Sequence, residues 1–397
     1  MQRQPRDNPR NCHHLISFTR LPTTMFILFS ILLILSRFST ATTESNVKAM
    51  FVFGDSIVDC GNNDFLDTYA KCNYFPYGVD FILRATGRCT NGRTPADFLG
   101  LFLGLPHFLP AFYDPQTRGS SILAGVNYAS GASGILDSTR QSLNVTSLSH
   151  QIANFGETTL PDLKSQLNGS FALSSYLSQS IFFFLIGGGD YMASCTTSSG
   201  VAVECDLQKL TELLIRNYTH HLMKAYDLGA RKFVVFNLLQ TGCDPYFKQR
   251  NNGSCVDLLN EGSTLFNNAL RPALENLSED LPGFSFVYIN MSGIINVIID
   301  DPTTYGLKLT NESCCFFNAA SVTESLCVEG DEACPDRSIY AYYDGLHLTE
   351  KLYMHLSAKA YSSDLQTEAY PFNVEVLANL DISLMLTGAP SFHTHDQ

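Results

Sequence analysis

The chain has 397 residues, of which 45% are hydrophobic, and its formal net charge at pH 7 is −13. This length allows a large core, in one big domain or two small ones. The acidic balance, without a basic run in the body of the chain, argues against nucleic acid as a partner.

The N-terminus has the pattern of a secretory signal peptide, which we predict over residues 1–41. Four arginines precede an apolar run over 25–35, and Ser39-Thr40-Ala41 supplies small residues that signal peptidases accept. The run is shorter than the roughly 20 apolar residues of a membrane-spanning helix. An uncleaved signal anchor is the alternative, and Met25 is an alternative start. We expect no stable membrane span after removal of the signal.

Sequons and cysteines agree with a secreted protein, either extracellular or in the cell wall. Seven Asn-x-Ser/Thr sequons together favour glycosylation. They begin at Asn144, Asn168, Asn217, Asn252, Asn276, Asn290 and Asn311. Of the 12 cysteines, Cys12 lies in the predicted leader, so 11 remain and at least one is free or pairs elsewhere. Without Cys-x-x-Cys or paired Cys/His spacing, disulfides are favoured over a metal site.

Short apolar segments alternate with amphipathic ones along the rest of the chain. Buried parallel strands are predicted at 49–53, 181–186, 232–239 and 284–289. Helices are predicted from Thr94-Pro95 onward and over 207–228, 256–277 and 349–361. This alternation predicts an α/β sandwich around a parallel sheet. Because ligands bind beyond the carboxyl ends of such strands, we expect Ser56, 187–190 and 237–242 to share one face.

Two motifs at opposite ends of the chain carry the parts of an acyl-transfer triad. Phe51–Ser56 has the pattern of a buried strand that delivers a serine into a tight turn, and Asp344 precedes His347 by three residues. His347 is the candidate base for Ser56, and Asp344 would accept a hydrogen bond from the imidazole Nδ1. Residues 300–337, rich in cysteine, are interpreted as a disulfide-stapled loop that fixes the approach to His347.

An oxyanion hole needs hydrogen-bond donors aimed at the charge that develops on the carbonyl oxygen. The backbone N–H of Ser56 is one candidate. The small residues of 127–134 allow another N–H to approach closely, and Gly131 is our choice within them. The chain has no Gly-x-Ser-x-Gly elbow, no phosphate-binding loop, no His-Glu-x-x-His and no dinucleotide-binding glycine pattern.

With these motifs in order, the chain resembles plant GDSL esterase/lipases of the SGNH-hydrolase superfamily from about Val47 to Tyr370. The matching segments are Phe53–Asp59, Gly61–Asn63, Tyr74–Gly78, Thr90–Thr94, Asn127–Leu136, Gly242–Pro245, Cys314-Cys315, Cys327, Cys334–Asp336 and Asp344–His347. The resemblance implies a three-layer α/β/α sandwich with a mainly parallel, flavodoxin-like sheet over 47–370, followed by a C-terminal extension over 371–397. It also implies a secreted serine esterase or lipase that acts on lipids or acylated small molecules, with no metal and no organic cofactor.

Two departures from the family pattern affect the expected site. The family's third block is Gly-x-Asn-Asp, whose Asn donates to the oxyanion, but here glycine, Gly189, stands at the Asn position. A missing donor costs ~3 kcal/mol, on the order of 10²–10³ in rate. A water or a backbone N–H exposed by the three glycines would replace this donor only in part, so we expect a slow or altered hydrolase, or a protein that has lost the reaction. Cys60 and Cys89 also depart from the pattern and are candidates for an extra disulfide, with Cys72 as one candidate partner.

Several functions remain compatible with these residues. An ester hydrolase is favoured, and the same site would be an acyltransferase if an alcohol replaced water. A carbohydrate esterase that removes acetyl groups from polysaccharide would use the same triad. Gly189 motivates a fourth function, a catalytically impaired protein that binds glycan or lipid on the same fold. The complete Ser–Asp–His set argues against this last alternative.

Overall fold

The computed structural model describes residues 47–167, 169–197, 200–318 and 325–382. The predicted signal peptide over 1–41 and the sequon at Asn168 lie outside these residues. Among the described helices, none is both long and apolar enough to cross a membrane.

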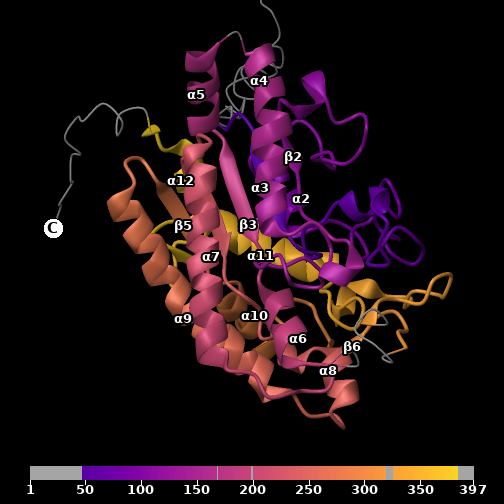
Figure 1. The fold of residues 1–397 in the computed structure, drawn as a ribbon. Coiled ribbons are helices and arrows are strands. Elements are labelled where there is room, and N and C mark those ends of the chain that lie inside the picture. Colours follow the sequence, from indigo (N-terminus) through magenta and orange to yellow (C-terminus); the bar gives the residue numbers. More distant parts are fainter. Residues whose placement is uncertain (1–46, 168, 198–199, 319–324, 383–397) are drawn as a thin grey trace, which may run out of the picture. The chain divides into compact units, whose positions relative to one another are not determined.

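A six-stranded sheet, in the order β2-β1-β3-β4-β5-β8, forms the centre of the fold (Figure 1). Strands β1 to β5 pair in parallel, and β8 joins β5 antiparallel, which confirms the mainly parallel sheet. A separate ladder joins β6 and β7. The strands are β1 (Met50–Gly54), β2 (Gly125–Asn127), β3 (Ile181–Leu185), β4 (Lys232–Phe236), β5 (Ser285–Ile289), β6 (Leu309–Ser313), β7 (Tyr340–Tyr342) and β8 (Ala369–Tyr370).

Helices cover both faces of this sheet and complete the three layers. The helices are α2 (Pro95–Phe102), α3 (Leu148–Asn154), α4 (Leu160–Gln166), α5 (Ser170–Ser178), α6 (Gly188–Cys195), α7 (Leu207–Asp227), α8 (Pro245–Arg250), α9 (Asp257–Asp280), α10 (Met291–Asp300), α11 (Glu350–Ser362) and α12 (Val374–Asn379). One face packs mainly against α3, α7 and α9, and the other against α2, α10, α11 and α12.

The central strands are apolar on both faces because helices bury both sides of the sheet. Phe51 and Phe53 of β1 point into one helical layer, while Met50 and Val52 point into the other. Phe53 stacks on Phe184 of the neighbouring strand β3, with ring centroids 4.9 Å apart. Burial of each such side chain contributes about 1.5–3 kcal/mol, so the central strands are held firmly in register.

The packed core continues beyond Tyr370, where the resemblance ends. Val374 and Leu377 of α12 are fully buried, and Lys232 Nζ donates a hydrogen bond to the carbonyl of Ala378 at 2.8 Å. Helix α12 therefore covers part of the sheet, although it lies in the segment that the sequence assigned to an extension.

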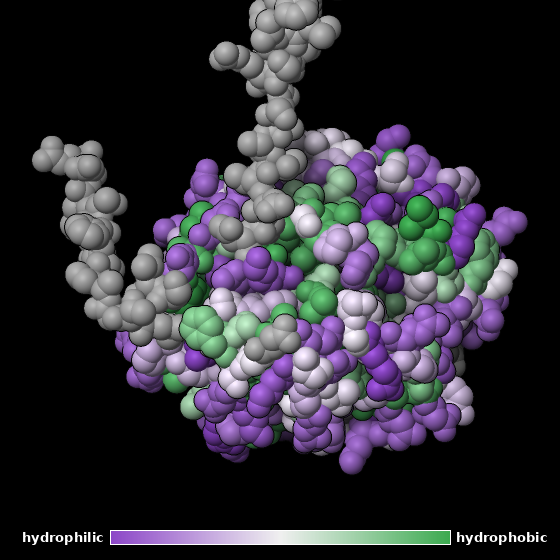
Figure 2. Space-filling view, turned by 90° about the horizontal axis from the view of Figure 1, so that it is seen from above, coloured by the Kyte–Doolittle hydropathy of each residue, from purple (hydrophilic) through white to green (hydrophobic). Residues whose placement is uncertain are grey.

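Five disulfides staple the loops of the described residues. They join Cys72–Cys89, Cys195–Cys205, Cys243–Cys255, Cys314–Cys334 and Cys315–Cys327. The expected disulfides are thus present. Of the two candidates for an extra disulfide, Cys89 pairs with Cys72, whereas Cys60 is a buried free thiol among the described residues. On the face shown in Figure 2, hydrophilic residues predominate, and hydrophobic side chains form separate groups rather than one continuous band.

Candidate active site

The order of the strands explains where the site forms. Strand β1 pairs with β2 on one side and with β3 on the other, so the chain reverses its direction of winding at β1. In such sheets a crevice opens beyond the carboxyl ends of the strands at the reversal. Ser56 follows β1 there, residues 127–134 continue from β2, and Gly187–Asp190 follow β3.

The turn after β1 presents Ser56 at the surface of this crevice. Gly54 ends the strand where a Cβ atom would lie 2.7 Å from the carbonyl oxygen of Leu185, so a side chain does not fit. The N–H of Ile57 donates to the Asp55 carboxylate at 3.1 Å and closes the turn. Ser56 is consequently half-buried, while Asp55 is buried beneath it.

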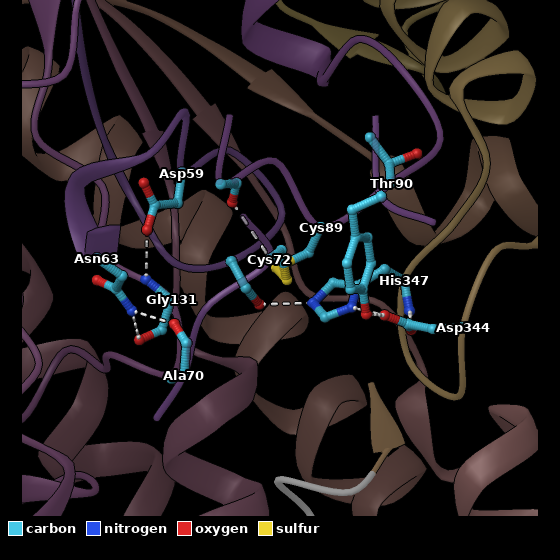
Figure 3. The surroundings of a disulfide bond; sticks show 12 residues. Asp59, Asn63, Ala70, Cys72, Cys89, Thr90, Gly131, Asp344 and His347 are labelled. Atoms are coloured by element: carbon cyan, nitrogen blue, oxygen red, sulfur yellow. Dashed lines mark hydrogen bonds and ion pairs between the residues drawn. A yellow bond between two sulfur atoms is a disulfide. The ribbon is translucent and has the colours of Figure 1, made fainter. Parts of the chain in front are cut away.

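A continuous line of hydrogen bonds runs from Ser56 to Asp344. Ser56 Oγ lies 2.7 Å from His347 Nε2, and His347 Nδ1 lies 2.8 Å from Asp344 Oδ2. The other oxygen of Asp344 accepts the N–H of His347 at 2.7 Å, so the carboxylate also holds the backbone of the turn. Figure 3 shows His347 facing Asp344, beside the Cys72–Cys89 disulfide. Such a line can move a proton away from an attacking serine.

Tyr77 adds a contact that the sequence did not predict. Its hydroxyl donates to Asp344 Oδ2 at 2.6 Å and accepts the N–H of Cys327 at 3.0 Å. Tyr77 is buried, and Cys327 belongs to the Cys315–Cys327 disulfide. The cysteine-rich loop therefore contacts the Asp344 carboxylate through Tyr77. It also holds the same turn directly, because Gly345 donates its N–H to the carbonyl of Ser325 at 2.9 Å.

The charges around His347 raise its pKa. Burial alone disfavours the imidazolium, but the charge and hydrogen bond of Asp344, together with the charge of Asp55, outweigh that effect and move the pKa above 6.5. Burial raises the pKa of Asp55 itself to about 7. Asp55 therefore loses its proton near pH 7, and because its charge acts on His347 the titrations of the two groups are coupled.

We expect kcat/KM to fall as the pH drops through the raised pKa of His347. Below that pKa the imidazolium has no lone pair for the serine proton, so the rate falls about tenfold per pH unit. Asp55→Asn removes a nearby negative charge, so it should lower the pKa of His347 and move this acidic limb to lower pH. A pH–rate profile of both proteins measures the shift, and coincident limbs would show that Asp55 does not act on His347.

The N–H of Gly131, a predicted oxyanion donor, already has an acceptor. It donates to Asp59 Oδ2 at 2.9 Å (Figure 3). Asp59 Oδ1 accepts the N–H groups of Gly61 and Asn62, so this carboxylate ties the turn after Ser56 to the loop after β2. The next residue, Ala132, has a left-handed φ of 65°. No acceptor among the described residues contacts its N–H, and Ala132 lines the same pocket as Ser56.

Gly189, which stands at the family's Asn position, is packed against backbone. It lies in the first turn of α6, where N–H groups have no intrahelical acceptor, and it lines the pocket. A Cβ atom there would lie 2.8 Å from the carbonyl oxygen of Ser133. At Gly188, by contrast, a Cβ atom would meet no atom within 4 Å.

We therefore expect Gly189→Ala to destabilise the protein by about 1–3 kcal/mol, because the added carbon forces the Ser133 carbonyl to move. The matched control is Gly188→Ala, which places the same methyl group in open space one residue earlier. Thermal unfolding of the two variants measures the difference. Equal melting temperatures would contradict the close packing at Gly189.

One pocket joins these groups. It encloses about 960 Å³, counting its opening to solvent, and Ser56 and His347 both line it. Most of its other lining is apolar, including Leu143, Met192 and Leu238. The residues after β1, β3 and β4 that the sequence placed on one face thus do meet. Within the described part of the chain, no group of three or more His, Cys, Asp and Glu side chains is arranged to hold a metal ion.

Comparisons with known proteins agree with this geometry. A family profile described as GDSL-like Lipase/Acylhydrolase matches residues 50–360. GDSL esterase/lipase At1g71691 of Arabidopsis thaliana is 36% identical over 345 residues, which cover 86% of this chain and 88% of that protein. GDSL esterase/lipase At1g29670 of the same plant is 34% identical over 86% of this chain and 94% of its own length. GDSL esterase/lipase 7, also from Arabidopsis thaliana, is 35% identical over 84% of this chain and 92% of its own length.

Proposed function

We propose, because this chain belongs to the GDSL lipase/acylhydrolase family and is a carboxylic ester hydrolase, that it cleaves esters of lipids or acylated small molecules through an acyl-enzyme on Ser56. The members of this family include esterase/lipases. The observation that carries this proposal is the line from Ser56 Oγ through His347 to Asp344, at 2.7 and 2.8 Å, on the wall of a largely apolar pocket.

The proposed reaction has two halves. Ser56 Oγ attacks the ester carbonyl while His347 Nε2 takes the hydroxyl proton, and the alcohol then leaves with that proton. Asp344 holds the imidazole with its proton on Nδ1 and stabilises the imidazolium. Water next attacks the acyl-enzyme, with His347 again as the base, and carboxylic acid is released. An alcohol in place of that water would give acyl transfer.

The oxyanion donors in this proposal are backbone N–H groups. The N–H groups of Ser56 and Gly189 were already candidates from the sequence. The N–H of Ala132 takes the place of the third candidate, Gly131, because the N–H of Gly131 is bonded to Asp59. Gly189 belongs to the N-terminal turn of α6, where the partial positive charge of the helix favours an anion. These donors would stand in for the missing Asn side chain.

Secretion and glycosylation remain part of the proposal. Five disulfides are expected of a protein that folds in an oxidising compartment. Asn252, Asn276 and Asn311 are exposed and suited to carry glycans, while the Nδ2 of the exposed Asn144 donates to the carbonyl of Asp67 at 3.3 Å. The side chain of Asn290 is engaged instead, since its Nδ2 donates to the carbonyl of Thr367 at 2.9 Å. The Asn217 side chain likewise bonds its own helix.

The proposal is tested on the chain that begins at about Thr42, expressed in a secretory host and purified. Hydrolysis of 4-nitrophenyl butyrate gives the rate, and a fluorophosphonate probe followed by peptide mass spectrometry locates the nucleophile. We expect turnover and a single adduct on Ser56. An adduct on another serine, or turnover without any adduct, would overturn the mechanism. Tight lipid or glycan binding without turnover would favour the binding-protein alternative.

A further inference from the structure

Arg140 is a cation in the pocket that the ester chemistry does not use. It lines the same cavity as Ser56 and His347, whose remaining lining includes Leu143, Met192 and Leu326. Ester cleavage by Ser56 needs hydrogen-bond donors and a base but no arginine. A half-buried guanidinium on an apolar wall therefore needs an explanation.

The guanidinium of Arg140 has no anionic partner in the described part of the chain. Burial lowers its pKa, and the offsetting group is the phenol of Tyr246 rather than any carboxylate. The buried Arg88 contacts Asp97 at 2.7 Å and the partly buried Arg337 contacts Asp80 at 2.6 Å, whereas the partly buried Arg231 donates to backbone carbonyls instead. A half-buried charge without a partner costs free energy that an anionic ligand would recover.

The loop that carries Arg140 is firmly held. The buried carboxylate of Asp190, in the first turn of α6, accepts the N–H groups of Ile135 at 2.9 Å and Leu136 at 3.1 Å, and the hydroxyl of Thr139. Arg140 follows directly, with a left-handed φ of 48° that a glycine would adopt without strain. Arg140 thus occupies a left-handed backbone conformation, which costs energy for residues other than glycine.

We propose that Arg140 binds an anionic group of the substrate, a carboxylate or a phosphate, so that the preferred ester is an amphiphile with both an apolar part and an anionic part. This inference rests on the proposed function for its reaction, but it concerns recognition. The planar fork of a guanidinium binds two oxygens of a carboxylate or phosphate at once. The apolar lining holds the remainder of the molecule.

The kinetic test compares charged esters with neutral ones of the same size. Mono-4-nitrophenyl glutarate against 4-nitrophenyl pentanoate tests an anion on the acyl side. Phenyl butyrate with a para carboxylate or a para phosphate, against the para-isopropyl and para-tert-butyl esters of similar size, tests the alcohol side and separates the two anions. We expect the wild type to prefer the charged ester in at least one arm. Arg140→Gln should lower that preference roughly 10- to 100-fold.

Three further variants make the result specific. Arg140→Gly suits the left-handed backbone and removes the cation, so it serves if Gln misfolds. Arg140→Lys keeps the charge without the fork and should lie between Gln and wild type. Arg216→Gln, on the exposed surface of α7, changes the net charge equally and should leave the preference unchanged. Equal preferences in wild type, Arg140→Gln and Arg140→Gly, or no preference in any arm, would overturn the proposal.

A binding experiment separates this inference from the proposed reaction. Calorimetry of Ser56→Ala with monobutyl glutarate measures recognition without turnover, and adding Arg140→Gln should weaken binding at least about tenfold. If the wild type hydrolyses no ester but this dependence holds, the reaction fails and the anion site stands. If esters are hydrolysed, and neither this binding nor the kinetic preference in either arm depends on Arg140, the anion site alone fails. This binding measurement therefore tests whether Arg140 binds an anion on the acyl side of the ester, even if the protein shows no turnover.

Discussion

Replacement of Ser56 by alanine is expected to lower kcat by about 10⁴- to 10⁶-fold, the loss that follows removal of a serine nucleophile. The hydroxyl lies 2.7 Å from His347 Nε2, and alanine removes it without adding bulk to the pocket. The residual rate would come from the oxyanion donors and from substrate binding. Initial rates with 4-nitrophenyl butyrate, corrected for background hydrolysis, measure the effect.

Ser133→Ala is the matched control for this loss. Ser133 lines the same pocket, but its hydroxyl donates to the carbonyl of Gly54 at 3.1 Å and does not contact His347. We expect it to retain at least about a tenth of the wild-type kcat, since the losses are two neutral hydrogen bonds, this one and the one accepted from Gln151 Nε2 at 3.4 Å. Comparable losses in the two variants would mean that a change of structure, rather than the nucleophile, explains the effect at Ser56.

The fold could largely be predicted from the sequence because its central strands are buried on both faces. The runs at 181–186 and 284–289 correspond to β3 and β5 within one residue at either end. Strands β2 and β8 were missed, since three and two residues are too few for a periodic pattern. The helix pattern at 207–228 was long enough to give α7 almost to its ends.

The candidate site was predictable only where a motif carried it. Ser56, Asp344 and His347 were nominated by their motifs, although Ser56 and His347 are 291 residues apart. Tyr77 lies in one of the matching segments, but its contact with Asp344, 267 residues away, follows no spacing rule. The direction of the Gly131 N–H depends on Asp59, 72 residues earlier. Such contacts arise from tertiary packing, so a single sequence does not contain them in readable form.

Asp344→Asn is expected to lower kcat about 10⁴-fold while the fold is retained. The carboxylate accepts three N–H or O–H groups besides the imidazole: the N–H of Leu346 at 2.8 Å, that of His347, and the hydroxyl of Tyr77. An asparagine oxygen can keep the two backbone bonds, which leaves its NH₂ facing His347 Nδ1. The imidazole must then accept there and carry its proton on Nε2, so it cannot take the proton of Ser56.

Tyr77→Phe distinguishes this tautomer effect from a simple loss of contacts at Asp344. It removes one hydrogen bond to the carboxylate and the acceptor of the Cys327 N–H, but leaves the charge and the Nδ1–H bond in place. We expect a fall of only about tenfold, the effect of one hydrogen bond to a charged group. The strongly deshielded Nδ1 proton of the imidazolium should persist in the NMR spectrum of Tyr77→Phe and vanish in Asp344→Asn. If Tyr77→Phe lost as much activity as Asp344→Asn, the position of the carboxylate, rather than its charge, would control the base.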